Sequence, residues 1–92
     1  MKYDVKFTSQ FKKDLKLAKK RGCNLDLLSE VVGKLSAEEK LEEKYHDHNL
    51  TGNYNGFREC HIEPDWLLVY RVIKKDLELF LFRTGTHSDL FR

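Results

Sequence analysis

The pattern of apolar and polar residues along the chain predicts a strand, two helices and then three more strands. Residues 3–7 alternate apolar and charged side chains, as a half-buried strand does. Apolar residues then recur at helical spacing on one face: Phe11, Leu15 and Ala18. Thr8 or Ser9 is a suitable N-cap for this first helix, and Gly22 is a suitable C-terminal stop.

A second helix is predicted to begin after Asn24, which is a favourable N-cap residue. It buries apolar side chains at helical spacing: Leu27, Leu28, Val31, Val32 and Leu35. Residues 36–39 read Ser-Ala-Glu-Glu and match a capping box, so we expect a further helical turn that runs through Leu41.

The second half of the chain predicts a loop followed by three strands. Residues 46–56 lack apolar periodicity, and Leu50 is expected to anchor this loop in the core. Strands are predicted over 57–62, 66–73 and 77–83, with turns at 63–65 and 74–76. Residues 88–91 are expected to form a short helical turn or a tail.

These elements predict a small α+β fold of order β-α-α-β-β-β, with two N-terminal helices packed on one face of an antiparallel-rich four-stranded sheet. The first strand is expected to join at an edge, which leaves the opposite face for chemistry. Ninety-two residues with 40% hydrophobic and 12% aromatic content indicate a single globular domain over 1–92.

No apolar run approaches the roughly 20 residues that a membrane span needs, and the first residues lack the apolar core of a signal peptide. Cys23 and Cys60 lie too far apart for a metal or redox motif, so we expect reduced thiols. Together these features predict a cytoplasmic protein without a membrane partner.

The charge is distributed unevenly along the chain. Residues 1–22 carry a net charge of +6, whereas the remaining 70 residues carry −4. The basic residues of the first helix lie on its polar side: Lys12, Lys13, Lys16, Lys19, Lys20 and Arg21. Such a surface favours a polyanionic partner, with an ordinary solvated helix face as the alternative.

All four histidines fall in the second half of the chain, near predicted strand ends: His46, His48, His61 and His87. Imidazole gives and takes protons near neutral pH, and Asp65 and Arg83 lie in the same part of the sequence. Several imidazoles, a carboxylate and a guanidinium are the groups that phosphodiester cleavage without a metal requires.

Other interpretations of these residues remain open. His61 could be a hydrogen-bonded edge histidine, and Trp66 could be a core residue instead of a stacking platform. His46, His48 and Asp65 could form a metal site, although no cysteine pair or HExxH motif supports one. Cys60 and His61 are adjacent on a strand and point to opposite faces, so they cannot form a nucleophile–base pair.

Two segments carry a family resemblance: Glu-Pro-Asp-Trp at 63–66 and Arg-Thr-Gly-Thr-His at 83–87. With the basic helix at 9–18 and the stretch 45–70, they make the chain similar to the RelE/ParE superfamily of bacterial toxins, and most of all to its YafQ-like branch. The resemblance implies a RelE-like fold and the toxin of a type II toxin–antitoxin system. It also implies a ribosome-dependent endoribonuclease that cleaves mRNA and inhibits translation.

Carried over by position, the resemblance implies a catalytic set: His48, His61, Asp65, Arg83 and His87. Arg83 matches a phosphate-contacting arginine, and Trp66 and Phe91 match positions that shape the substrate site or stack in it. We assign His87 as the acid that protonates the leaving group. The base lies among His48, His61 and Asp65, and no metal or other cofactor is expected.

The resemblance also implies partners: the ribosome, mRNA and a DinJ-like antitoxin, expected as a heterotetramer with two copies of each chain. The basic helix is then expected to dock on ribosomal RNA. Two alternatives belong to other classes of protein: a non-catalytic RNA- or ribosome-binding module, and a gyrase-poisoning ParE-type toxin. The histidine-rich set argues against both.

Overall fold

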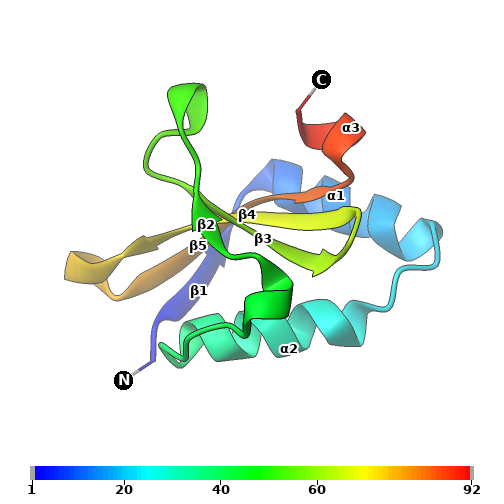
Figure 1. Cartoon of the computed structure of the whole chain (residues 1–92). Coiled ribbons are helices and arrows are strands. Elements are labelled where there is room, and N and C mark those ends of the chain that lie inside the picture. The colour runs from blue at the N-terminus through cyan, green and yellow to red at the C-terminus, as the bar shows by residue number, and fades with distance from the viewer. Residues whose placement is uncertain (1, 92) are drawn as a thin grey trace.

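The computed structural model describes residues 2–91 and contains one mixed sheet with its two long helices on one side (Figure 1). The strands are β1 (Asp4–Phe7), β2 (His48–Asn49), β3 (Arg58–Glu63), β4 (Trp66–Ile73) and β5 (Glu78–Gly85). The α-helices are α1 (Ser9–Lys20), α2 (Leu25–Ser36) and α3 (His87–Leu90). Short 3-10 turns are η1 (Glu43–Tyr45), η2 (Gly52–Tyr54) and η3 (Lys74–Asp76).

The sheet has the order β1-β5-β4-β3-β2, and β1 lies at one edge, as the sequence predicts, where it pairs in parallel with β5. The predicted four strands are one too few. The segment interpreted as an irregular loop contains β2, whose two residues pair antiparallel with β3. Two residues are too short a run for period-2 alternation to reveal.

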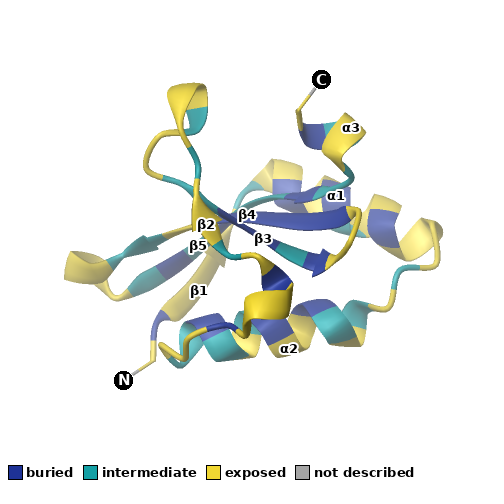
Figure 2. Ribbon diagram, in the orientation of Figure 1, coloured by how far each residue is buried: buried dark blue, intermediate teal, exposed yellow. Residues whose placement is uncertain are grey.

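The main core lies between the sheet and the two long helices, and Figure 2 shows the buried side of each helix turned toward the strands. The helices contribute Phe11, Ala18, Leu28, Val31 and Leu35. The sheet contributes Cys60, Ile62, Trp66, Leu68, Tyr70, Leu79 and Leu81. The predicted placement of both helices on one face is therefore confirmed.

The outer edge of β5 contacts two elements in turn: first β1, and then the start of α1 and its side chains. β1 ends at Phe7, and the Thr8 side chain then caps α1 by accepting a hydrogen bond from the Phe11 amide at 2.9 Å. The same hydroxyl donates to the Phe82 carbonyl of β5 at 2.8 Å. Beyond β1, side chains of α1 therefore meet the backbone of β5.

The predicted helical turn through Leu41 is wrong. Ser36 is the last residue of α2, and its hydroxyl donates to the Tyr3 carbonyl at 3.0 Å instead of capping a new helix. Glu38 then adopts a left-handed backbone with φ of 63°, which turns the chain away. The tertiary contact with Tyr3 outweighs the local capping-box signal.

The opposite face of the sheet has a smaller apolar cluster of its own. Leu67, Val69 and Leu90 are buried there, and Leu50, Phe57 and Phe82 pack against them. α3 and the loop around η2 rise on this side of the sheet in Figure 1. Leu50 thus anchors its loop as predicted, and this face is only partly free. None of the described helices is long and apolar enough to cross a membrane.

Candidate active site

Three imidazoles and two carboxylates gather at the end of β3. Cys60 and Ile62 point into the helix-side core, so Glu59 and His61 emerge on the opposite face. The ring of His61 lies 6.4 Å from the ring of His48 on β2 and 5.6 Å from the ring of His87 on α3. The structure thus brings together three histidines that are separated in the sequence.

Glu59 is the carboxylate that these rings share, and the sequence analysis did not place it in the site. Its Oε1 atom lies 3.4 Å from His61 Nε2 and 3.7 Å from His48 Nε2, and its side chain is only 7% exposed. Strand alternation was the available signal, since it puts Glu59 on the same face as His61. His48 lies near Glu59 because β2 pairs with β3, and the sequence did not reveal β2.

Asp65 holds His87 in place. Its Oδ1 atom accepts hydrogen bonds from the His87 backbone amide at 3.0 Å and from His87 Nδ1 at 2.7 Å. The bond from the backbone amide, and to a smaller extent the bond from Nδ1, lowers the pKa of the Asp65 carboxyl. Because Nδ1–H is committed to Asp65, Nε2 is the atom with which His87 can meet a substrate.

His46 belongs to the cluster as well, although the sequence analysis left it out of the catalytic set. Its ring lies 5.4 Å from the ring of His61, edge to face. Its backbone carbonyl accepts a hydrogen bond from His48 Nδ1 at 2.6 Å, which leaves His48 Nε2 without a proton in the neutral ring. His46 has a left-handed backbone with φ of 48°, a conformation that costs about 1–2 kcal/mol.

Hydrogen bonds that Asp47 accepts from side chains of β3 and β4 hold this left-handed turn against the sheet. Asp47, between the two histidines, accepts a hydrogen bond from the Tyr70 hydroxyl at 2.5 Å and from Arg58 Nη2 at 3.0 Å. Arg58 Nη1 also donates to Asn49 at 2.6 Å. Burial raises the pKa of the Tyr70 phenol, so it donates as a neutral hydroxyl. The strained segment is therefore fixed by groups from β3 and β4.

A cleft of about 800 Å³ opens beside the histidines. Its walls come from α2, η1, the segment after η1 and the end of β3, and they include His46, His48, His61, Tyr45, Lys44 and Pro64. The imidazoles of His48 and His61 therefore border open space large enough for part of a polynucleotide.

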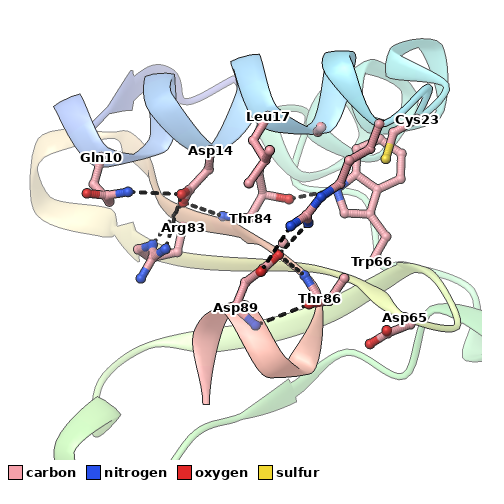
Figure 3. A pocket seen from close by; sticks show the side chains of 13 residues that line it. Gln10, Asp14, Leu17, Cys23, Asp65, Trp66, Arg83, Thr84, Thr86 and Asp89 are labelled. Carbon is pink, nitrogen blue, oxygen red and sulfur yellow. Dashed lines mark hydrogen bonds and ion pairs between the residues drawn. The ribbon is translucent and has the colours of Figure 1, made fainter. Parts of the chain in front are cut away.

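Arg83 lies in a second, smaller pocket of about 270 Å³ between α1, β5 and α3 (Figure 3). Its guanidinium forms an ion pair with Asp14 of α1, with Arg83 Nε 2.8 Å from Asp14 Oδ2. The ion pair raises the pKa of Arg83. Asp65 also borders this pocket, and it binds His87 of the histidine cluster.

The structure gives Trp66 and Phe91 different surroundings. Trp66 is 5% exposed in the helix-side core, where its indole N–H donates to the Thr84 hydroxyl at 2.9 Å. Phe91 is exposed after α3 and packs edge to face on Tyr54, with ring centroids 5.3 Å apart. Trp66 is thus a core residue, and Phe91 has an accessible ring.

The basic side chains predicted on α1 are exposed: Lys12, Lys13, Lys16, Lys19, Lys20 and Arg21. Arg21 differs from the lysines because it pairs with Asp89 of α3, with Nη1 2.7 Å from Oδ2. Asp89 also accepts from the Thr86 amide and completes the capping box of α3. Arg21 therefore ties α1 to the helix that carries His87.

One group of donors in the described chain has the geometry of a metal site. Single ligand atoms of Glu59, His61 and His87 all lie within 4.8 Å of one another. One carboxylate and two imidazoles are ligands that Zn²⁺ and Cu²⁺ accept.

The sequence and the fold both match known proteins. Residues 3–92 match the family described as the bacterial toxin of type II toxin–antitoxin system, YafQ. The mRNA interferase toxin YafQ of Escherichia coli strain K12 is 39% identical, over 96% of this chain and 95% of that protein.

Two solved structures share the fold. A metal-bound toxin from Helicobacter pylori superposes with a TM-score of 0.92 and 48% identity, over 97% of this chain and 99% of that one. The toxin in the E. coli DinJ–YafQ toxin–antitoxin complex gives a TM-score of 0.90 at 38% identity, with both chains covered in full.

Proposed function

The chain belongs to the YafQ family of bacterial type II toxins, and we propose that the cluster around His61 is where it cleaves mRNA. Its function is that of an mRNA interferase, an endoribonuclease. Of the functions that the sequence left open, a binding-only module and a gyrase poison do not agree with this assignment.

The observation that carries the proposal is the gathering of proton-transfer groups beside an open cleft. His48, His61 and His87 come from three separate elements, and two carboxylates orient their rings. Such a gathering has no role in the hydrophobic core, because all three rings lie on the face opposite the helices or on α3. It suits general acid–base chemistry on a phosphodiester.

In the proposed reaction the 2′-hydroxyl of the RNA attacks the adjacent phosphorus. The new P–O2′ bond forms as the P–O5′ bond breaks, which gives a 2′,3′-cyclic phosphate and a 5′-hydroxyl. His87 Nε2–H donates its proton to the leaving O5′ atom. Asp65 keeps His87 in position for that transfer by holding both its amide and its Nδ1–H.

We assign the base to His48. Asp65 is committed to His87, which removes it from the three candidates. His61 is 21% exposed and packed among the other rings, whereas His48 is 50% exposed and presents an unprotonated Nε2. The His46 carbonyl then orients His48 through Nδ1–H, and His61 and Glu59 help to position the substrate without taking the 2′ proton themselves.

Arg83 is proposed to bind the scissile phosphate and to stabilise the charge that develops on its oxygens. Phe91 is proposed to stack on a base. Trp66 is proposed to support the β5 side of the substrate site from within the core, through its hydrogen bond to Thr84. Base stacking on an exposed aromatic ring is worth about 1–3 kcal/mol.

The remaining proposals concern partners. The lysine face of α1 binds ribosomal RNA, so cleavage occurs on the ribosome. Because DinJ accompanies YafQ in the E. coli complex, this chain is proposed to bind a DinJ-like antitoxin in a heterotetramer. We further propose that residues 1–92 act as a single domain in the cytoplasm.

The test is to map new 5′ ends of cellular mRNA after expression without antitoxin. Wild-type protein should produce cuts at fixed positions within codons, and His87→Gln and His48→Gln should lose them. Asp76→Asn, in the exposed turn η3, is the matched control and should cleave like wild type. Intact mRNA during growth arrest would contradict the proposal.

Metal binding is a second candidate function, favoured by the donor set Glu59, His61 and His87. The Helicobacter pylori neighbour described as metal-bound supports it, at 48% identity. A bound divalent ion would supply a Lewis acid at this position. The proposed cleavage uses these side chains for proton transfer and orientation instead.

A further inference from the structure

The first helix carries a buried acid that its amphipathic pattern does not require. Asp14 lies in the same stripe as Phe11 and Ala18, which face the core, and it is 8% exposed. A carboxylate in that stripe is costly to bury unless other groups satisfy it. A leucine at this position would be enough to pack the helix on the core, so packing does not explain why an acid stands there.

Four donors from two elements satisfy Asp14 (Figure 3). Arg83 donates from Nε at 2.8 Å and from Nη2 at 3.1 Å. The Thr84 amide, on the edge of β5 that β1 leaves open, donates at 3.2 Å. Gln10 Nε2, one turn earlier on α1, donates at 3.0 Å. The carboxylate therefore fixes both the arginine side chain and the strand that carries it.

The geometry leaves half of the guanidinium available. Asp14 takes the edge formed by Nε–H and one Nη2–H, and Arg83 Nη1 makes no hydrogen bond to the described residues. The outer edge, with Nη1–H and the second Nη2–H, is a second planar fork that can bind two phosphate oxygens. An arginine held by one edge is pre-organised at the other.

We infer that Asp14 is a positioning residue that aims the outer edge of Arg83 at the scissile phosphate of the RNA. The inference rests on the proposed function, because Arg83 must be the phosphate-binding arginine. It assigns α1 a part in the chemistry, in addition to the lysines on its other side.

The experiment is a double-mutant cycle on mRNA cleavage by purified toxin with programmed ribosomes, measured in a single turnover. Asp14→Asn keeps the size of the side chain but places amide hydrogens against Arg83 and Thr84. We expect its cleavage rate to fall about 10- to 100-fold, as misplacement of a catalytic group does. Ribosome binding should be unchanged, since the lysine face is intact.

The cycle separates positioning from folding. In an Arg83→Ala background, Asp14→Asn should cause no further loss of cleavage, because the group it positions is gone. A purely structural role predicts the same fractional loss in both backgrounds. Asp14→Leu suits the apolar stripe but leaves the Thr84 amide and Arg83 without their acceptor, so it should fold with a lower melting temperature and lose cleavage. Thermal melting checks that the variant is folded at the temperature of the cleavage assay. The control is the same change on the exposed side of α2, Asp26→Asn, which should cleave like wild type.

Two results have different meanings. Full activity of Arg83→Ala would refute the proposed role of Arg83 and, with it, the premise of this inference. An inactive Arg83→Ala together with wild-type activity of Asp14→Asn and Asp14→Leu would overturn the role of Asp14 alone and leave the proposed function in place.

Discussion

Asp65 binds the backbone amide and the side chain of the same residue, His87, through a single oxygen atom. The turn after β3 and the first residue of α3 are thereby joined, although 22 positions separate them in the sequence. The ring orientation of His87 thus depends on a carboxylate in a surface turn and on the position of α3. What holds α3 therefore also holds the proposed acid.

Asp89 should make stability depend on acidic pH. The hydrogen bond from Arg21 and the amide of Thr86 lower the pKa of the Asp89 carboxyl below its unfolded value, near 3.9. The stabilisation is then complete above that value and is lost as pH falls toward the folded pKa, because the unfolded chain binds more protons. Thermal melting between pH 6 and 3 should show a smaller fall for Asp89→Asn than for wild type. Equal falls would contradict the prediction.

Gly85 should not tolerate a side chain. A Cβ atom there would lie 2.8 Å from Asp89 Oδ2 and 3.0 Å from Asp89 Cβ, so α3 would have to shift. We expect Gly85→Ala to cost about 1–3 kcal/mol in unfolding free energy and to reduce cleavage by displacing His87. Denaturant unfolding measures the cost. Gly85→Ala in an Asp89→Gly background removes both contacts, so its cost should shrink there; an unchanged cost would exclude this contact as the cause.

The local sequence pattern correctly predicted the elements whose buried apolar residues recur at a regular spacing. The faces of α1 and α2, the bounds of β4 and the edge position of β1 follow from periodicity, because these runs are long enough to display it. Ser36 shows the limit of that approach. Its capping-box pattern is genuine, but a hydrogen bond to Tyr3, 33 positions away, decides where the helix ends.

The parts of the site that sequence could not reveal depend on partners far along the chain. Asp14 meets Arg83 and Thr84 about 70 positions later, and Arg21 meets Asp89 at a similar separation. Periodicity marks Asp14 only as a polar interruption in a stripe. The family motifs named the histidines and Asp65, which the fold does bring together, but they did not name the groups that orient them.

The lysine face of α1 should bind RNA by charge. Lys12, Lys16 and Lys19 are exposed, so changing all three to Glu should weaken ribosome binding and flatten its salt dependence. The matched control changes the exposed Lys40, Lys74 and Lys75 to Glu, which alters the net charge equally at other places. Ribosome pelleting at several salt concentrations distinguishes the two variants. Equal loss in both would show that net charge, not this face, determines binding.

Divalent metal should inhibit cleavage at the histidine cluster. A metal held by Glu59, His61 and His87 would coordinate a ring nitrogen of His87 and would so prevent the imidazolium form that donates the proton to the leaving group. Titration calorimetry with Zn²⁺ or Cu²⁺ should detect one site, and Glu59→Gln should weaken it at least tenfold while the exposed Glu63→Gln binds like wild type. Chelator-treated toxin should cleave programmed mRNA at the full rate, and added metal should slow it in proportion to occupancy. Activity that chelator abolishes and metal restores would instead make the ion a participant in the reaction.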